Sequence, residues 1–333
     1  MLKRFLTVCL GLTLLAGASM AMTLNGAGAT FPYPIYSKWF SQYEKETGVR
    51  INYAPIGSGG GIRQFTAGVV NFGATDAAMT DKEIADAGGD VVHIPTVMGA
   101  IAVVYNGDFS GLKLDSRTLA AIFLGEIKQW NDPKILALNP GVNLPDKDIM
   151  VAHRSDSSGT TDIFTSYLAK VDTTWAAKVG AGKSVAWPAG VGGKGNPGVT
   201  AIVKNNSGAI GYVELAYAET NDLPVAAIKN RSGKFVKPSV DGTTAAAAGA
   251  IDKIPADFRG EILNQKGFES YPICGLTWIV LHRHQSDTEA GTSLKAFLKW
   301  ALTDGQTYAR DLYYAPLPSV LAAKVLTVIN SIK

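Results

Sequence analysis

Helical and strand-like patterns of apolar residues alternate along this chain. One apolar stripe at helical spacing follows Pro32, a residue that favours the first turn of a helix, and the stripe ends at Gly48. Its members are Ile35, Tyr36, Trp39, Phe40 and Tyr43. The patterns predict further helices at 62–67, 81–87, 293–302 and 320–329, and strands at 51–56, 99–105, 149–152, 209–213 and 277–282. Such alternation predicts an α/β architecture.

A hydroxyl-rich loop at residues 154–160, RSDSSGT, stands directly before an apolar helical pattern at 163–168. The first amides of a helix have no acceptor within the helix and carry the positive end of its dipole, so they favour a small anion. Arg154 adds a forked cation, and Ser158 and Thr160 add hydroxyl donors. For one loop alone, an ordinary helix N-cap explains the same residues.

Three further loops of this kind lie upstream. The loop at 26–31, GAGATF, opens the helix that carries the apolar stripe. The loop at 57–61, GSGGG, joins a strand to a helix, and the loop at 71–76, NFGATD, leads to the helix near 81–87. Glycine loops join strands to helices in most α/β proteins, so each is a weak signal by itself. Four loops with polar tips predict convergence on one small oxyanion.

The N-terminus has the pattern of a secretory signal peptide over residues 1–21. Lys3 and Arg4 precede an apolar run at 5–16, and small residues around position 21 provide a cleavage signal. The run is shorter than the roughly 20 residues that span a bilayer. Cys9 lies inside this segment, so the mature chain keeps only Cys274 and forms no internal disulfide. We expect Cys274 to be a buried small hydrophobe.

The net charge of the chain does not indicate binding to a nucleic acid or to an anionic membrane. Of the 31 basic residues, 29 remain without Lys3 and Arg4, against 28 acidic residues, which is a net charge of +1.

The chain is long enough for two cores, because domains commonly contain about 100 to 200 residues.

Other motif matches lack their structural context. The segment 182–184, GKS, has Ala177 where a phosphate-binding P-loop needs glycine. The segment 190–195, GVGGKG, matches a dinucleotide pattern, but it follows Trp187-Pro188 and no convincing helix opens at Gly195, which favours a backbone turn. The four histidines, at 93, 153, 282 and 284, have no metal-ligand spacing. No metal and no cofactor are predicted.

Six segments together resemble the phosphate-binding protein family of the bacterial phosphate-specific (Pst-type) ABC importers. They are residues 26–40, 51–65, 71–80, 153–168, 191–199 and 208–218, and the resemblance extends from about residue 25 to about residue 320. Two departures stand beside the motifs: His153 replaces a basic residue found in many relatives, and Ser157 replaces a glycine. Neither side chain is expected to contact the anion.

The resemblance implies a phosphate site built from all four loops. The implied phosphate-binding residues are Thr30, Phe31 (through its backbone amide), Ser58, Asp76, Arg154, Ser158, Gly159 and Thr160. It also implies that Asp156 orients Arg154 without itself contacting the phosphate. Asp76 places a carboxylate in an anion site, and a carboxylate accepts hydrogen bonds but cannot donate them. The site is therefore expected to accept phosphate, which brings a proton, and to reject sulfate.

The resemblance also implies a two-lobed periplasmic binding protein fold of the α/β class, type II-like. Two hinge segments cross between the lobes and the ligand cleft lies between them. The expected division is a signal peptide at 1–21, lobe I at 22–100 and 259–333, and lobe II at 101–258. The apolar runs near 99–105 and 276–282 are the expected crossings.

The implied function is the binding of inorganic phosphate with high affinity in the periplasm and its delivery to an ABC importer. The expected partners are the phosphate anion and the importer's permease and ATPase complex at the inner membrane, with no nucleic acid, and the protein is expected to be a monomer. It is not expected to be an enzyme. The alternatives are a secreted phosphate-handling enzyme of the phosphatase kind, or a receptor for another tetrahedral oxyanion. A phosphatase would need metal ligands or a positioned nucleophile and base.

Overall fold

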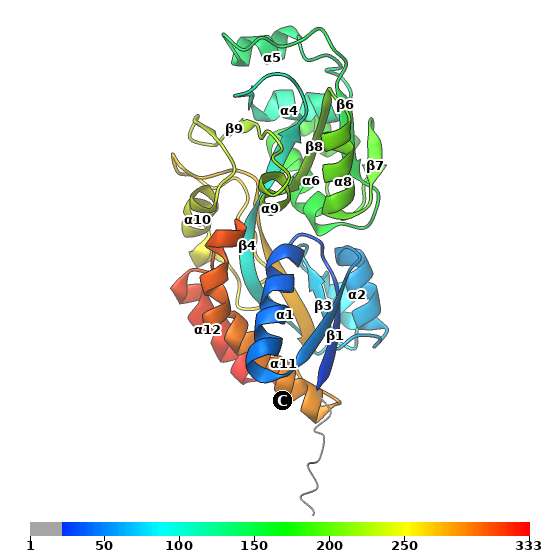
Figure 1. The fold of residues 1–333 in the computed structure, drawn as a ribbon, viewed down its shortest axis with the longest axis vertical. Coiled ribbons are helices and arrows are strands. Elements are labelled where there is room, and N and C mark those ends of the chain that lie inside the picture. The colour runs from blue at the N-terminus through cyan, green and yellow to red at the C-terminus, as the bar shows by residue number, and fades with distance from the viewer. Residues whose placement is uncertain (1–21) are drawn as a thin grey trace, which may run out of the picture.

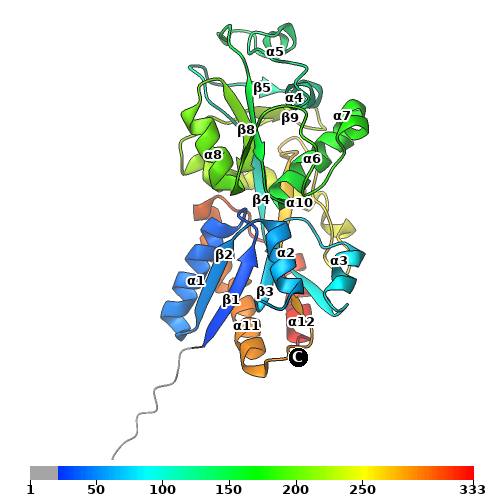
Figure 2. The same cartoon turned by 90° about the vertical axis from the view of Figure 1, so that its right-hand side faces the viewer.

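The computed structural model describes residues 22–333 (Figures 1 and 2). The predicted signal peptide at 1–21, with Lys3, Arg4 and Cys9, lies outside the described residues. The strands are β1 (Thr23–Gly28), β2 (Arg50–Pro55), β3 (Phe72–Thr75), β4 (Val91–Tyr105), β5 (Lys113–Leu114), β6 (Met150–Arg154), β7 (Val191–Gly193), β8 (Ala209–Glu214), β9 (Ala227–Lys229), β10 (Phe235–Val236) and β11 (Cys274–His282).

Helices separate most of these strands, so the predicted α/β class is confirmed. The α-helices are α1 (Tyr33–Thr47), α2 (Ser58–Thr66), α3 (Asp81–Asp86), α4 (Ser116–Phe123), α5 (Pro133–Leu138), α6 (Gly159–Val171), α7 (Thr173–Lys178), α8 (Gly195–Asn205), α9 (Leu215–Glu219), α10 (Val240–Ala248), α11 (Thr288–Ala301) and α12 (Ser319–Asn330). Short 3₁₀ helices occupy Ile251–Lys253, Asp304–Tyr308 and Arg310–Leu312. Within residues 22–333, no helix combines the length and the apolar character needed to cross a membrane.

The main sheet has eight strands in the order β2-β1-β3-β11-β4-β8-β6-β7. Its two ends are parallel: β1 pairs with β2 and β3, and β6 pairs with β7 and β8. The two central strands, β11 and β4, pair antiparallel with each other and with their outer neighbours. A smaller sheet, in the order β10-β9-β5, lies outside this series.

The long strand β4 joins two lobes, which are visible one above the other in Figure 1. Its residues up to Ala100 pair with β11, and from Ile101 onward they pair with β8. We call the part with β1, β2, β3 and β11 the first lobe, and the part with β6, β7 and β8 the second lobe. The residue boundaries predicted for the lobes stay a prediction.

The second crossing does not coincide with the apolar run at 276–282. All of β11 pairs with the first part of β4, and its middle also pairs with β3, so β11 is a central strand of the first lobe. The chain reaches that lobe before Cys274, because Ile101 N in β4 already donates to Ile273 O. The apolar run reflects a strand buried on both faces, which looks the same as a buried crossing in sequence.

The apolar stripe of α1 is buried as predicted. All five stripe residues are at most 6 % exposed, and the helix ends at Gly48, which adopts the left-handed conformation with φ 74°. Trp39 Nε1 donates to Gly305 O at 2.7 Å. The stripe therefore holds α1 against the C-terminal part of the first lobe.

Cys274 is also buried, as expected, and burial raises the pKa of its thiol to about 12.

The glycines of the first two loops allow close packing within regular elements. Gly26 and Gly28 are the last part of β1, where a Cβ atom would lie 2.1 Å from the Phe72 ring and 2.0 Å from Ala74 O respectively. The run at 59–61 forms the first turn of α2, which begins at Ser58. A Cβ on Gly61 would lie 2.4 Å from the Gly28 backbone. The predicted loops at these positions were too long, because glycine also marks close backbone contacts.

A helix does open at Gly195, which corrects the prediction of a simple turn there. The segment 191–193 forms the edge strand β7, and α8 begins at Gly195. Gly195 has φ +69°, a conformation that glycine adopts without strain, and this turns the chain from strand to helix. The consequence is a further helix N-terminus, carrying Asn196, at the junction of the lobes.

Candidate anion-binding site

The N-termini of four helices meet where the two lobes face each other (Figures 1 and 2). Helix α1 follows the Thr30–Phe31 segment and α2 begins at Ser58 in the first lobe, whereas α6 begins at Gly159 and α8 at Gly195 in the second. Each N-terminus presents amides without helical partners and a positive dipole end. The junction is therefore electrostatically suited to an anion.

Ser58 connects the two lobes directly. Its side chain is fully buried, and its Oγ accepts from Asp76 N at 3.2 Å and from Gly159 N at 3.1 Å. Asp76 lies in the first lobe immediately after β3, and Gly159 begins α6 in the second lobe. Three predicted site residues from three separate loops therefore share one hydroxyl group.

Arg154 is held by Asp156 in a two-pronged ion pair. Arg154 Nε donates to Asp156 Oδ1 at 2.7 Å, and Nη2 donates to Oδ2 at 2.6 Å. Asp156 Oδ1 also accepts from Gly195 N. Although burial alone would raise it, the hydrogen bonds and positive charge of Arg154 hold the pKa of Asp156 below its ordinary value. The remaining Arg154 nitrogen, Nη1, donates to Thr160 Oγ1 at 3.2 Å.

Two buried tyrosines hold the backbone carbonyl groups of Thr30 and Phe31. Tyr217 Oη donates to Thr30 O at 2.5 Å, and Tyr314 Oη donates to Phe31 O at 2.6 Å.

Ser158 is the N-cap of α6, where its Oγ accepts from Thr161 N at 3.1 Å. A capping serine uses an oxygen lone pair for the helix and keeps its proton for another acceptor.

Asp76 is buried beside these donors and is 3 % exposed. Burial raises the pKa of Asp76 to about 7, and this rise is opposed by a hydrogen bond from Thr277 and by the charge of Arg154. Thr277 Oγ1 donates to Asp76 Oδ1 at 2.8 Å, which leaves Oδ2 as the oxygen nearer to Ser58. With this pKa, Asp76 changes its protonation state near neutral pH.

Asn196 belongs to the same cluster and was missed by the sequence reasoning. Its side chain is fully buried and its Nδ2 donates to Thr30 Oγ1 at 2.9 Å and to Thr160 Oγ1 at 3.1 Å. Those two threonines come from different lobes. The available signal is a polar residue directly after a glycine that opens a helix, in a segment whose sequence predicts a turn.

Glu214 is a second buried polar residue that the sequence reasoning missed. It is 0 % exposed, and burial raises its pKa well above the ordinary value. Tyr314 Oη donates to Phe31 O at 2.6 Å and is within donating distance of Glu214 Oε2, at 3.0 Å. Glu214 Oε2 also accepts from Ala216 N at 2.9 Å, at the start of α9. Glu214 therefore contacts the tyrosine that holds the Phe31 backbone.

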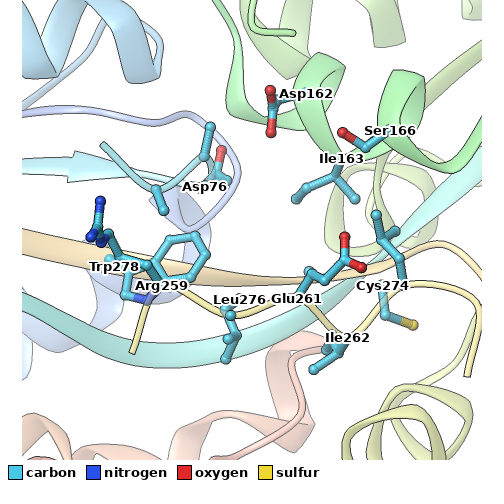
Figure 3. Close-up of a pocket in the computed structure, with 15 residues that line it drawn as sticks. Asp76, Asp162, Ile163, Ser166, Arg259, Glu261, Ile262, Cys274, Leu276 and Trp278 are labelled. Carbon is cyan, nitrogen blue, oxygen red and sulfur yellow. The ribbon is translucent and has the colours of Figure 1, made fainter. Parts of the chain in front are cut away.

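A cavity of about 380 Å³ lies beside Asp76, between the lobes (Figure 3). Ile163 and Ser166 line it from α6, and Leu276 and Trp278 line it from β11. Close by, the lobes are joined by an ion pair in which Lys183 Nζ lies 2.5 Å from Glu83 Oε1. Gly59 N also donates across the junction to Ser157 O at 3.0 Å. The two lobes are therefore in contact around the candidate site.

The predicted site residues lie in two hydrogen-bonded groups that meet at the start of α6, where Gly159 precedes Thr160. One group joins Ser58, Asp76 and Gly159. The other joins Thr30, Arg154, Asp156 and Thr160 through Asn196, while Ser158 caps α6 and Phe31 contributes its backbone. The structure thus brings together residues more than 100 positions apart in sequence. Their role as direct ligands stays a prediction.

Comparison with known proteins places the chain among binding proteins. A family model described as a PBP superfamily domain matches residues 16–305. The "Phosphate-binding protein PstS" of Pasteurella multocida is 44% identical over 328 residues, which cover 98% of this chain and 95% of that protein. The protein of the same name from Haemophilus influenzae is 44% identical over 310 residues, covering 92% of each.

Solved structures share the fold at lower sequence identity. A high-affinity periplasmic phosphate-binding protein, PfluDING, bound with phosphate, has a TM-score of 0.72 at 24% identity and covers 92% of this chain and 93% of its own. A phosphate-binding protein from Stenotrophomonas maltophilia has a TM-score of 0.71 at 19% identity, with 92% and 93% covered. These likenesses confirm the two-lobed binding-protein fold.

Proposed function

This chain belongs to the PstS phosphate-binding proteins of the PBP superfamily, and from that premise we propose that it binds inorganic phosphate between its two lobes. It acts in the periplasm and delivers phosphate to the permease and ATPase complex of an ABC importer. It carries out no covalent chemistry on the anion. The phosphate ligands are Thr30, the Phe31 amide, Ser58, Asp76, Arg154, Ser158, Gly159 and Thr160.

One observation supports this proposal above the others, namely that donors from both lobes converge on one place. Gly159 N of the second lobe donates to Ser58 Oγ of the first at 3.1 Å. Arg154 is 3 % exposed and donates to Thr160, the residue after Gly159, and its charge is balanced by Asp156. Hydrogen bonds to an anion are stronger in a site with little water, so a tetrahedral anion needs no additional lysines.

Because the donors are divided between lobes, phosphate should hold the lobes together. An anion can reach all of the donors only when Ser58 and Asp76 face Arg154 and Gly159. The Glu83–Lys183 ion pair and the Gly59–Ser157 hydrogen bond span the same junction and support the closed arrangement. Ligand binding then shifts the population from open to closed molecules.

We expect phosphate to compact the protein and to stabilise it without being chemically changed. At a phosphate concentration 100 times the Kd, linkage contributes about 2.7 kcal/mol to the free energy of unfolding. Small-angle scattering and thermal denaturation with and without phosphate measure both effects. Incubation with p-nitrophenyl phosphate tests for the alternative enzyme, which would release nitrophenol. An unchanged radius and melting temperature at saturating phosphate would contradict the proposal.

Sulfate binding should depend on pH in a direction set by Asp76. Sulfate carries no proton at neutral pH, so it can bind only when Asp76 is protonated and donates a hydrogen bond. Since burial raises the pKa of Asp76 to about 7, its protonated fraction grows about tenfold per unit as the pH falls towards 7, and then levels off. Calorimetry with sulfate between about pH 9 and about pH 6 should show affinity rising in that way. Affinity that is constant or falls on acidification would exclude this role of Asp76.

A further inference from the structure

The side-chain amide of Asn196 has a defined orientation. Glu214 N donates to Asn196 Oδ1 at 2.9 Å, and a backbone N–H can only donate. This contact assigns the oxygen of the amide to the side of Glu214. The NH₂ group must therefore face the opposite side, where Thr30 and Thr160 lie.

The hydroxyl oxygens of both threonines then accept two hydrogen bonds each. Thr30 Oγ1 accepts from Asn196 N at 3.1 Å and from Asn196 Nδ2 at 2.9 Å. Thr160 Oγ1 accepts from Arg154 Nη1 at 3.2 Å and from Asn196 Nδ2 at 3.1 Å. A hydroxyl group has two acceptor lone pairs and one proton. With both lone pairs used, each threonine has only its proton left to offer.

We propose that Asn196 fixes the polarity of the cleft, by forcing the hydroxyl groups of Thr30 and Thr160 to act as donors towards the bound anion. This inference rests on the proposed phosphate function. Asn196 is a positioning residue, because it acts through the two hydroxyl groups. Without its NH₂ group, either hydroxyl could rotate its proton towards Asn196 and present a lone pair to phosphate, which would repel it.

A similar arrangement occurs at Ser58. Ser58 Oγ accepts from Asp76 N and Gly159 N, so its proton is left to donate, and Asp76 Oδ2 lies 3.4 Å away as an acceptor. Asn196 differs from Ser58 in that its one NH₂ group sets two hydroxyls, from different lobes, at the same time.

The exchange Asn196→Asp tests this polarity directly. An ionised carboxylate at this position accepts the threonine protons and turns both hydroxyl groups away from the anion. Hydrogen bonds to charged groups contribute enough that losing two of them should weaken phosphate binding roughly 100-fold or more near neutral pH. Protonation of the new carboxyl group restores a donor, so the ratio of wild-type to variant affinity should shrink as the pH falls. Calorimetry with inorganic phosphate across pH measures this ratio.

Two further variants separate polarity from charge and from stability. Asn196→Leu removes the donors without adding a charge, so its affinity should fall about tenfold or more, with a ratio to wild type that does not change with pH. Asn139→Asp is the matched control: Asn139 is 2 % exposed, and it hydrogen-bonds to Lys113 and Ile135 in the second lobe, away from the cleft. It should leave phosphate affinity within about twofold of wild type.

The outcomes distinguish this inference from the proposed function. Wild-type affinity in folded Asn196→Asp and Asn196→Leu proteins would overturn the role of Asn196 while leaving phosphate binding intact. A ratio for Asn196→Asp that stays constant with pH would also overturn it, because a merely structural defect does not titrate. If Asn196→Asp fails to fold, the affinity of Asn196→Leu decides. Failure of both the wild-type protein and Asn139→Asp to bind phosphate would overturn the proposed function itself.

Discussion

Asp76→Asn is expected to admit sulfate to the cleft while phosphate stays bound. Thr277 Oγ1 donates to Asp76 Oδ1 at 2.8 Å, so an asparagine keeps its oxygen there and places its NH₂ group at the Oδ2 position, near Ser58. That group donates to a sulfate oxygen, where the carboxylate opposed lone pair with lone pair. Dibasic phosphate is retained because it can turn an unprotonated oxygen to the new donor. Because the pKa of Asp76 is about 7, only about 1 % of the wild-type protein has a protonated Asp76 at about pH 9, so the gain for sulfate should be about 100-fold there and should shrink towards pH 7.

Competition calorimetry with phosphate and sulfate on both proteins at about pH 9, where wild-type Asp76 is almost fully ionised, measures this change in selectivity. Asp162→Asn is a matched control, because Asp162 lines the same cavity from α6 and burial also raises its pKa, to about 6. This control removes a neighbouring carboxylate without touching Ser58, so selectivity for phosphate should persist. Comparable binding of the two anions by the wild-type protein at that pH, or continued rejection of sulfate by Asp76→Asn, would refute the proposal that Asp76 selects for a ligand that carries a proton.

Local sequence signals were sufficient for the elements that depend on local physics. The α1 stripe has helical spacing, a proline at its start and a glycine at its end, and each signal acts within the helix itself. Helix α3 is similar, since Thr80 and Glu83 form a capping box at its start. The site loops could be found because hydroxyl groups next to glycine at a helix start have a physical reason to occur together. Their repetition predicted convergence on one small anion, whereas the identity of the anion and of its ligands depended on the resemblance to a family.

Features set by distant partners could not be obtained from the sequence. Gly61 in α2 is required by the close approach of the Gly28 backbone in β1, and nothing local separates that requirement from a turn. Asn196 is meaningful only with Thr30, which is 166 positions away. Glu214 looks like an ordinary charged residue in the sequence, and the raised pKa of its carboxyl group follows only from its burial in the fold. Tertiary contacts therefore decide which polar residues belong to the site.

Arg154→Lys is expected to weaken phosphate binding, although the exchange keeps the positive charge. The guanidinium group of Arg154 makes two contacts with Asp156 and one with Thr160, in a plane that a single ammonium cannot reproduce. A lysine that stays with Asp156 gives up the contact with Thr160 and the forked approach to the anion. Loss of one or two charge-assisted hydrogen bonds predicts a drop in affinity of roughly 10- to 1,000-fold.

The companion exchange Asp156→Asn separates orientation from charge. It removes a negative charge near an anion, which would strengthen binding if long-range attraction dominated. We expect weaker binding instead, because Arg154 loses one of its two carboxylate contacts and the free guanidinium can rotate away from the anion. Calorimetry of the two single variants and the double variant should show effects that do not add, since both changes act through Arg154. Arg259→Lys is the control, because Arg259 pairs with Asp257 in the same two-residue spacing outside the network. Tighter phosphate binding by Asp156→Asn would show that Asp156 does not orient Arg154.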